Sequence, residues 1–490
     1  MTDLMLVNPL ILKDDPVESR LMTPYFPLGL LYLAAVVREA GYTVSIFDAM
    51  FADSDDAFVR ALEREKPRVV GFGVLATVRQ AAFRLAGLAK ANGATVIAGG
   101  ADPTARPALY LQRRADGRHV IDIAVIGEAE DTILELLPLL LRRGTPDGAL
   151  EDVQGIAYRV EQGDVIQTGR RPLLDDVDAL PFPARDLLNL DEYRRTWRDH
   201  HDRFSLSIIA SRGCPYGCTW CQKSVFGRSF RPRAADAVAE EMALVKRLHA
   251  PDHVRIVDDV MGIDRGWVRS FHDAVIRRDA VIPFECLSRV DLMDEEVAGL
   301  LKEIGCRRIH FGAESGSQHV LNNMNKGITV EQIREAADLC RRVGIETYFY
   351  MMVGYPGETW SDLQRSVRLL RETIPDEFST TIAYPLPGTP FHDEVRDRLK
   401  VDDSAAPDWR HTAENRVLFE RGPLSTAFYR RVIRWYHSEW RDARIQAGGP
   451  ASSPERVRAK LGLWRDRVLV RLLSRVPGTL HATLRPTLED

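Results

Sequence analysis

The 490-residue sequence has few cysteines, no long apolar run and nearly balanced charge. Six cysteines are too few for a disulfide framework in a chain of this length. No run of about 18 apolar residues occurs, so no membrane-spanning helix is predicted. A formal net charge of −4 gives no general case for binding nucleic acid. The acidic N-terminus lacks the basic region of a secretion signal, and the sequence predicts a cytoplasmic protein of two or three domains.

Three of the cysteines stand together at the spacing C-x3-C-x2-C: Cys214, Cys218 and Cys221. They follow the apolar run 204–210, which is typical of a buried strand, so they are expected in a loop at its carboxyl end. Clustered thiolates favour iron–sulfur clusters, zinc or copper(I). Structural zinc needs a fourth ligand, and no nearby Cys or His has finger-like spacing. A three-ligand site suits a cluster with one open iron, and zinc is the alternative that metal analysis decides.

With Trp220 directly before Cys221, this motif resembles the signature of the radical S-adenosylmethionine (SAM) superfamily. The resemblance implies that Cys214, Cys218 and Cys221 are catalytic ligands of a [4Fe–4S] cluster. It also implies that SAM binds the fourth iron and that Trp220 borders its adenine. An external one-electron reductant of the flavodoxin or ferredoxin type would then drive cleavage of SAM to a 5′-deoxyadenosyl radical.

Residues 1–145 alternate between strand and helix patterns, which predicts an α/β domain with a doubly wound parallel sheet. The expected strands are 4–8, 43–47, 69–74, 94–98 and 121–126. Ligands of such sheets bind outside the carboxyl ends of the strands. The candidate cofactor-binding residues at these ends are Asn8, Asp48, Thr77, Gly99, Gly100, Gly127 and Glu128. No G-x-G-x-x-G follows the first strand and no Walker A motif occurs, which disfavours a dinucleotide fold.

The segments 27–34, 99–100 and 127–132 together resemble the cobalamin-binding domain that precedes many radical-SAM domains. The resemblance implies that residues 1–145 bind cobalamin. The motif Asp-x-His-x-x-Gly is absent, and Asp102 stands where relatives often place a His. The expected consequence is cobalamin held without a histidine lower ligand. The alternative is a degenerate domain that no longer binds cobalamin.

Residues 146–200 are expected to form a connector, with a β-hairpin over 156–168 and a proline-punctuated linker over 175–186. Residues 201–400 are expected to form the radical-SAM domain. Its predicted strands are 204–210, 254–257, 282–287, 308–311, 347–353 and 379–383. Six βα units with polar strand ends indicate a partial (β/α)6 TIM-type barrel, whose site lies at the carboxyl ends of the strands.

Several polar residues at these strand ends suit the groups of SAM. Arg289 can pair with a carboxylate through two hydrogen bonds. Asp258, Asp259 and Glu314 can accept hydrogen bonds from the amine or the ribose hydroxyls. The segment 312–315 resembles the family's fourth-strand motif, which places Glu314 and Ser315 near SAM. The other cysteines lie in apolar patterns and are expected to be packed thiols: Cys286, Cys306 and Cys340.

Residues 401–490 are expected to form a helical C-terminal region. The segments 408–411 and 425–445 carry aromatic residues that could line a substrate opening, although ordinary helix packing explains them better. The segment 454–476 has the pattern of a basic amphipathic helix. It is expected either to contact an anionic membrane peripherally or to pack on the protein.

These features predict a cobalamin-dependent radical-SAM enzyme that C-methylates an unactivated carbon of a small molecule through a 5′-deoxyadenosyl radical and methylcobalamin. One alternative is a non-methylating reaction, such as ring closure or oxygenation of a tetrapyrrole or secondary metabolite. Another is a non-catalytic cobalamin or cluster sensor. No nucleic-acid partner is expected.

Overall fold

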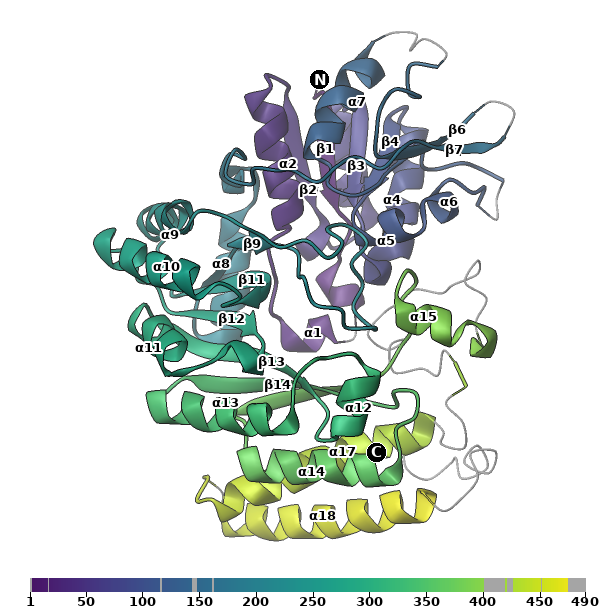
Figure 1. Cartoon of the computed structure of the whole chain (residues 1–490). Coiled ribbons are helices and arrows are strands. Elements are labelled where there is room, and N and C mark those ends of the chain that lie inside the picture. Colours follow the sequence, from purple (N-terminus) through teal and green to yellow (C-terminus); the bar gives the residue numbers. More distant parts are fainter. Residues whose placement is uncertain are drawn as a thin grey trace. The chain divides into compact units, whose positions relative to one another are not determined.

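The computed structural model describes residues 2–15, 17–114, 117–142, 148–160, 163–400, 419–420, 426–450 and 452–474 (Figure 1). They fall into two compact units. The first contains Met1–Pro215 and Gln222–Val257, and the second contains Tyr216–Cys221, Asp258–Asp402 and the described residues from 419 onward. The cysteine loop therefore contributes to both units, with Cys214 in the first and both Cys218 and Cys221 in the second.

The first sheet begins with five parallel strands in the order β2-β1-β3-β4-β5. They are β1 (Leu4–Asn8), β2 (Val44–Asp48), β3 (Val69–Gly73), β4 (Thr95–Gly99) and β5 (Ile123–Val125). Side chains alternate between the faces of a strand, so Leu4 and Leu6 enter one apolar cluster while Met5 and Val7 enter another. The predicted doubly wound sheet is confirmed.

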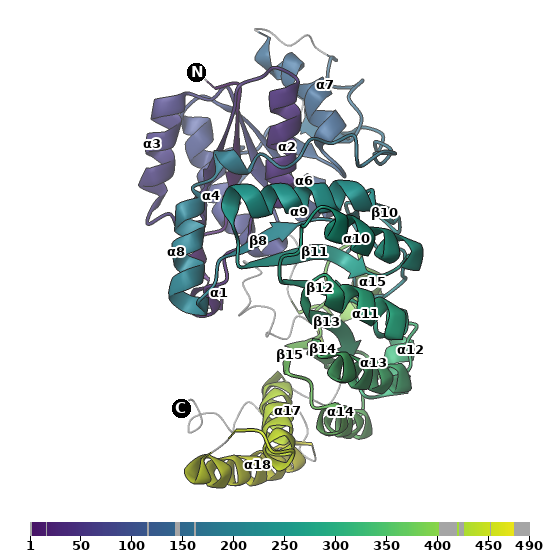
Figure 2. The same cartoon turned by 90° about the vertical axis from the view of Figure 1, so that its left-hand side faces the viewer.

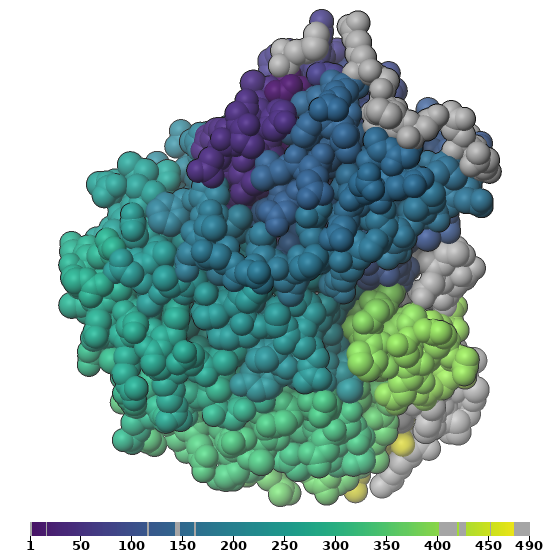
Figure 3. Space-filling view, turned by 45° about the horizontal axis from the view of Figure 1, so that its top comes forward, coloured from purple at the N-terminus to yellow at the C-terminus, as the bar shows by residue number. Residues whose placement is uncertain are grey.

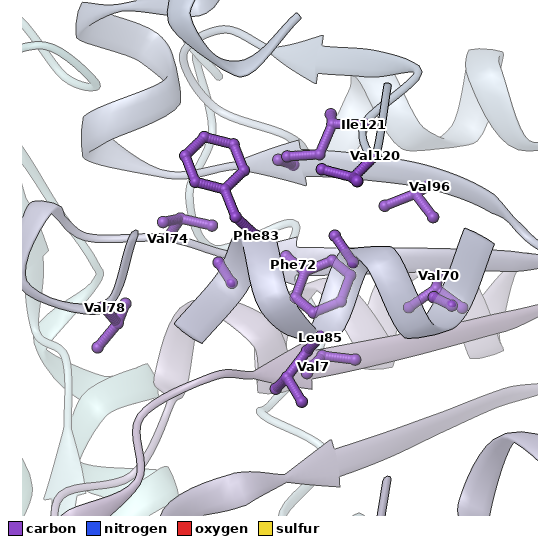
Figure 4. Close-up of a cluster of buried hydrophobic side chains, with 14 of the residues drawn as sticks. Val7, Val70, Phe72, Val74, Val78, Phe83, Leu85, Val96, Val120 and Ile121 are labelled. Atoms are coloured by element: carbon purple, nitrogen blue, oxygen red, sulfur yellow. The ribbon is translucent and has the colours of Figure 1, made fainter. Parts of the chain in front are cut away.

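Helices cover both faces of this sheet. Residues of α2 (Leu28–Glu39) and α7 (Glu130–Leu141) join the cluster that contains Leu4. Residues of α3 (Asp55–Glu65) and α4 (Arg79–Ala91) join the cluster that contains Met5. Figure 4 shows part of this second cluster, in which Phe72 of β3 and Phe83 of α4 lie among valines from several elements.

The connector differs from the expectation in one respect. The predicted hairpin is present as β6 (Ile156–Arg159) and β7 (Val165–Gln167), but β6 pairs with β5 in the antiparallel direction. The hairpin therefore extends the first sheet to seven strands, because its backbone groups satisfy those at the edge of β5. A helix that the pattern did not predict, α8 (Leu190–His201), follows the linker.

The second sheet has the strand order β15-β14-β13-β12-β11-β8. Its strands are β8 (Ser205–Ile208), β11 (His253–Met261), β12 (Phe284–Ser288), β13 (Cys306–Glu314), β14 (Glu346–Val353) and β15 (Glu377–Ile382). The pairings β8–β11, β12–β13, β13–β14 and β14–β15 are parallel. The intervening helices include α9 (Ala235–His249), α10 (Arg265–Arg277), α11 (Glu295–Glu303), α13 (Val330–Val343) and α14 (Trp360–Thr373). This confirms the predicted second α/β fold.

Two strands extend further along the chain than the sequence pattern predicts. Strand β11 continues past Val257 to Met261, and β13 continues past Phe311 to Glu314. The acidic pair 258–259 looked like a strand end, but the two side chains alternate, with Asp258 buried and Asp259 exposed. A strand accommodates such a pair because successive side chains point to opposite faces, so only Asp258 is buried.

Two long helices form the described C-terminal region. Helices α17 (Thr426–Gln446) and α18 (Ser453–Leu473) lie side by side (Figure 2), and α17 also contacts α14. Trp360 of α14 stacks on Trp435 of α17 with 5.2 Å between ring centroids. The predicted helix over 425–445 is confirmed, and the segment 408–411 lies outside the described residues. Shorter helices are α1 (Glu18–Leu21), α5 (Ala101–Ala105), α6 (Pro107–Tyr110), α12 (Gln318–Asn323) and α15 (Pro390–Glu394).

Within the residues that the structure describes, none of the helices combines the length and apolar character needed to cross a bilayer. In the space-filling view, the light-green residues that include α15 gather in one patch on the face shown (Figure 3).

We predict that Gly100→Ala destabilises the protein by about 2 kcal/mol or more. Gly100 has φ +112°, and an added Cβ would lie 2.7 Å from the carbonyl oxygen of Val74. Denaturant unfolding of the variant measures the change. Gly29→Ala is the matched control, because nothing lies within 4 Å of its added Cβ, and we expect no loss of stability. Equal stability of the two variants would contradict the prediction.

Candidate functional site

Two of the predicted binding residues meet at the carboxyl ends of β1 and β2. The Asn8 side chain donates to Asp48 Oδ1 at 2.8 Å, and the hydroxyl of Tyr193 from α8 donates to Asp48 Oδ2 at 2.6 Å. Burial raises the pKa of Asp48 although these groups and the backbone N–H of Met50 donate to it. Tyr193 in turn stacks on Phe26 at 4.2 Å. This edge of the sheet is therefore held by α8, and cofactor contact by Asn8 and Asp48 stays a prediction.

The Gly-Gly turn after β4 is also tightly held. Asp102, which replaces the His expected from relatives, is buried and pairs with Arg79 through two hydrogen bonds of 2.6 and 2.7 Å. The hydroxyl of Tyr110 donates to the same carboxylate at 2.5 Å. Thr77 lies half-buried in a 3-10 turn just before Arg79. The place of the missing histidine is thus occupied by a buried polar cluster.

Glu128, in the turn after β5, is the centre of a buried ion-pair network. Its Oε1 accepts from Arg212 at 2.8 Å and from Arg231 at 3.0 Å. Its Oε2 accepts from Arg231 at 2.8 Å and from the backbone N–H of Leu174 at 2.9 Å. Glu130 binds the other end of the Arg212 guanidinium at 2.6 Å. Four donors fill the acceptor positions of the Glu128 carboxylate, so its observed role is to hold the two arginines.

These arginines flank the cysteine loop. They lie on β9 (Ser211–Arg212) and β10 (Arg231–Pro232), which pair in the antiparallel direction and close the loop at its base. Gly213, between Arg212 and Cys214, has φ +84°, and an added Cβ would lie 2.5 Å from the carbonyl oxygen of Ser229. Only glycine fits this position, because a side chain would meet backbone there.

The Gly-Gly turn reaches the same loop. The hydroxyl of Ser224, three residues after Cys221, donates to the carbonyl oxygen of Ala101 at 2.9 Å. Arg170 donates to the carbonyl oxygen of Ser224 at 2.6 Å. Two turns predicted to hold cobalamin, Gly99-Gly100 with Ala101 and Gly127-Glu128, therefore lie against residues on either side of the cysteines.

In the second unit, Thr219 anchors the middle of the cysteine loop. Its backbone N–H donates to the carbonyl oxygen of Met324 at 3.0 Å, and its hydroxyl lies 2.6 Å from that of Tyr355. Its carbonyl oxygen accepts from the backbone N–H of Phe391 in α15 at 3.0 Å. The loop is fixed by these contacts on both sides of Thr219.

Arg289 already has partners in the protein. It binds Asp291 through two hydrogen bonds of 2.9 and 3.1 Å, and its guanidinium lies 3.7 Å from the ring centroid of Tyr216 in the cysteine loop. Asn325 donates to the carbonyl oxygen of Gly217 at 2.9 Å. Arg289 is thus close to the loop, and a bond from it to SAM stays a prediction.

Glu314 forms a buried ion pair beside Trp220. Its carboxylate lies 3.0 Å from Lys326 Nζ, which stands 5.6 Å from the centroid of a Trp220 ring. Burial would lower the pKa of Lys326, but the negative charges of Glu314 and of a Cys218 thiolate outweigh it and raise the pKa. The indole N–H of Trp220 is buried without a hydrogen-bond partner among the described residues. A cation and an orphaned donor thus stand beside the loop, where a cluster and SAM would bring negative charge.

The remaining predicted SAM contacts differ in their surroundings. Asp258 is buried and Asp259 is exposed, so one strand cannot present both to the same ligand. Ser315 is fully buried, and its hydroxyl lies 3.2 Å from that of Ser366 in α14. Ser315 therefore holds β13 against α14, and contact with SAM through its side chain stays a prediction.

The strand pattern pointed to Tyr348 and Tyr350, with core packing favoured over substrate contact, but it missed His310 and Glu285, which join them in a polar cluster on β12–β14. His310 is buried, and its ring centroid lies 4.8 Å from that of Tyr348. Its Nδ1 lies 3.3 Å from the hydroxyl of Tyr350. Its Nε2 lies 3.5 Å from a Glu285 oxygen. The register pairs His310 with Tyr348, and the period-2 polar positions in 308–310 and 346–350 were the available signal.

No cysteine among the described residues forms a disulfide. Cys214, Cys218 and Cys221 are half-buried, whereas Cys286, Cys306 and Cys340 are buried, as the sequence predicts for packed thiols. Burial raises the pKa of the Cys340 thiol to about 12, so this thiol stays protonated. Across the described parts of the chain, no three His, Cys, Asp or Glu side chains stand in a metal-binding arrangement. The assignment of Cys214, Cys218 and Cys221 as cluster ligands therefore depends on the sequence motif.

Comparison with known proteins identifies the class. The radical SAM superfamily matches residues 208–370, and the B12 binding domain matches residues 20–137. An uncharacterized methyltransferase of Pyrococcus horikoshii is 30% identical over 396 residues, covering 79% of this chain and 82% of the relative. An anaerobic magnesium-protoporphyrin IX monomethyl ester cyclase of Rubrivivax gelatinosus is 28% identical, covering 77% and 67%.

A solved structure has the same fold. The radical SAM methyltransferase TsrM of Kitasatospora setae, with cobalamin and a [4Fe–4S] cluster bound, aligns with a TM-score of 0.68 at 20% identity, covering 81% of this chain and 78% of that one. The chain belongs to the radical SAM superfamily, in the branch that carries a B12-binding domain. It is a radical-SAM enzyme whose cofactors are a [4Fe–4S] cluster, SAM and cobalamin. The half-buried thiols, Lys326 and the orphaned Trp220 donor fit the cluster and SAM.

We predict that Glu128→Gln costs about 3–5 kcal/mol at neutral pH, because two buried arginines lose their counter-ion. Burial alone would raise the pKa of Glu128, but hydrogen bonds from Arg231 and Arg212 hold the pKa below its usual value of 4.5. The stabilisation is therefore present above the ordinary glutamate pKa and is lost as pH falls through the lowered one. Unfolding curves at several pH values test this.

The control for that variant is Glu135→Gln, which removes a half-exposed partner of Arg171 and should cost less than about 1 kcal/mol. A Glu128→Gln protein that loses as much stability as the parent on acidification would show that the Glu128 network does not titrate in this way.

A double-mutant cycle on Lys326 and Glu314 tests the second ion pair. Either Lys326→Met or Glu314→Gln should cost about 3–5 kcal/mol, because each leaves one buried charge without its partner. The double variant should lose less than the sum of the two. The exposed pair Arg269–Glu296 provides the control, where Arg269→Gln should change stability by less than about 1 kcal/mol. Additive losses at 326 and 314 would refute the coupling.

Proposed function

We propose that this enzyme C-methylates an unactivated carbon of a small-molecule substrate. The observation that carries the proposal is the contact of the predicted cobalamin turns with the flanks of the cysteine loop. Glu128 binds Arg212, and Ala101 accepts from Ser224, on opposite sides of the three cysteines. Within the first unit, these contacts tie the residues just before and just after the cysteines to the turns that we propose hold cobalamin. The methyltransferase name of the Pyrococcus relative supports the same reaction.

When bound, the cluster and SAM supply the radical that removes hydrogen, and cobalamin supplies the methyl group. The chain itself supplies orientation and charge. Lys326 and Glu314 form a buried ion pair beside Trp220, and hydrogen bonds to Thr219 hold the loop backbone in place. The cluster of His310, Tyr348 and Tyr350 offers ring surface and hydrogen bonds by which β13 and β14 would position a substrate. We further propose a cytoplasmic location and a flavodoxin- or ferredoxin-type reductant.

The second candidate is a non-methylating reaction such as ring closure or oxygenation. The similarity to an enzyme named as a magnesium-protoporphyrin ester cyclase favours it, since that relative matches 77% of this chain. The two reactions differ in their by-products, because methylation consumes a second SAM and releases S-adenosylhomocysteine whereas ring closure does not.

We predict that the anaerobically reconstituted protein, given SAM, cobalamin and a chemical reductant, forms both 5′-deoxyadenosine and S-adenosylhomocysteine. Chromatography of the nucleosides measures both. Cys218→Ala should abolish 5′-deoxyadenosine, because one cluster ligand is lost. Cys340→Ala, which removes a packed thiol, should retain it.

Each other outcome selects an alternative. Formation of 5′-deoxyadenosine without S-adenosylhomocysteine would exclude methylation and favour the cyclase-type reaction. Absence of both products in protein with a full complement of iron and cobalamin would favour a sensor. Zinc in place of iron by metal analysis would exclude the radical mechanism.

A further inference from the structure

Helix α18 has two apolar faces, only one of which packs against the protein. Leu463 and Val470 are buried, and the carboxylate of Asp466 accepts from Ser438 of α17 at 2.6 Å. These residues face α17, which lies beside α18 in Figure 2. The opposite face carries five large apolar side chains that are exposed by 38–68%: Val457, Leu461, Trp464, Val468 and Leu472. Their spacing of three or four residues places them in one stripe along the helix.

Basic side chains border this exposed stripe on both sides. At 100° per residue, Lys460, Arg467 and Arg471 fall on one border, and Arg458 and Arg465 on the other. Arg467 pairs with Glu439 of α17 through two hydrogen bonds, and Arg465 lies 3.2 Å from Asp466. The helix contains two acids, of which Asp466 is buried and Glu455 closes a capping box with Ser452. The outward side of α18 is therefore apolar in the middle and positive at its edges.

A basic cavity adjoins the stripe. It has a volume of about 380 Å³ and lies between α17 and α18, and Arg441, Arg458 and Arg465 are among the residues that line it. Leu461 of the apolar stripe also lines it. A cavity with three arginines suits a phosphate oxyanion, because guanidinium groups donate paired hydrogen bonds to phosphate.

We propose that α18 docks the protein on an anionic phospholipid membrane. The apolar stripe enters the boundary between headgroups and acyl chains, and the bordering basic side chains other than Arg467 contact lipid phosphates. The cavity beside Leu461 takes one headgroup phosphate. A second copy of this chain fits the face less well, because two stripes placed together would also bring together two sets of basic side chains. This inference is independent of the reaction that the enzyme catalyses.

The test is co-sedimentation of the full-length holoenzyme with vesicles of phosphatidylcholine alone or mixed with phosphatidylglycerol. We expect binding to the mixed vesicles, weakened by salt. The double variant Leu461→Ser/Trp464→Ser and the double variant Arg458→Gln/Arg465→Gln should each bind about tenfold more weakly or worse. Leu248→Ser is the matched control, because Leu248 is 61% exposed on α9, and it should bind as the parent does.

A second measurement locates the contact. Lipids brominated in their acyl chains should quench part of the tryptophan fluorescence, and Trp464→Phe should remove that part. Equal binding to both vesicle types, binding by the Leu461/Trp464 variant at the parent's level, or no binding would overturn the proposal. A dimer in sedimentation velocity that this variant dissociates, without vesicle binding, would assign the stripe to self-association instead.

Discussion

The carboxylate of Glu128, buried with two guanidinium groups, is the interaction on which the rest of the first unit depends. Moving these charges out of water is costly, and the cost is offset only while all three stay paired in good geometry. Glu128 belongs to the turn after the last parallel strand of the B12-binding domain, whereas Arg212 and Arg231 close the base of the cysteine loop. The network therefore fixes where the cysteine loop begins relative to the sheet before any cofactor binds.

In the second unit, contacts within the protein also hold the middle of the cysteine loop. Hydrogen bonds to Thr219 and Gly217 hold the backbone, and Tyr216 lies under the Arg289 guanidinium. The Lys326–Glu314 pair adds a buried cation beside Trp220. The residues around the middle of the loop are therefore held by contacts within the protein itself. The protein orients the cofactors and sets their surroundings, and the cofactors carry out the bond making.

Several residues that looked like ligands turn out to have partners within the protein. Asn8 and Asp48 bind each other and Tyr193, and Asp102 binds Arg79. The sequence could show that polar residues follow these strands, because strand periodicity is local. It could not show these partners, because Tyr193 lies 145 residues after Asp48 in the chain. The same reason explains why the sequence did not show that His310 lies beside Tyr348.

The sequence by itself determined the class of enzyme, since three cysteines at one spacing and glycines after successive strands are local patterns with a specific chemistry. It also determined both α/β folds, because alternating strand and helix patterns fix parallel pairing. Tertiary structure alone decided that the hairpin β6–β7 extends the first sheet, that Glu128 holds two arginines, and that one face of α18 packs while the other is exposed. Each of these depends on contacts between residues far apart in the chain, and burial of a charge or an apolar face is a property of the folded surroundings.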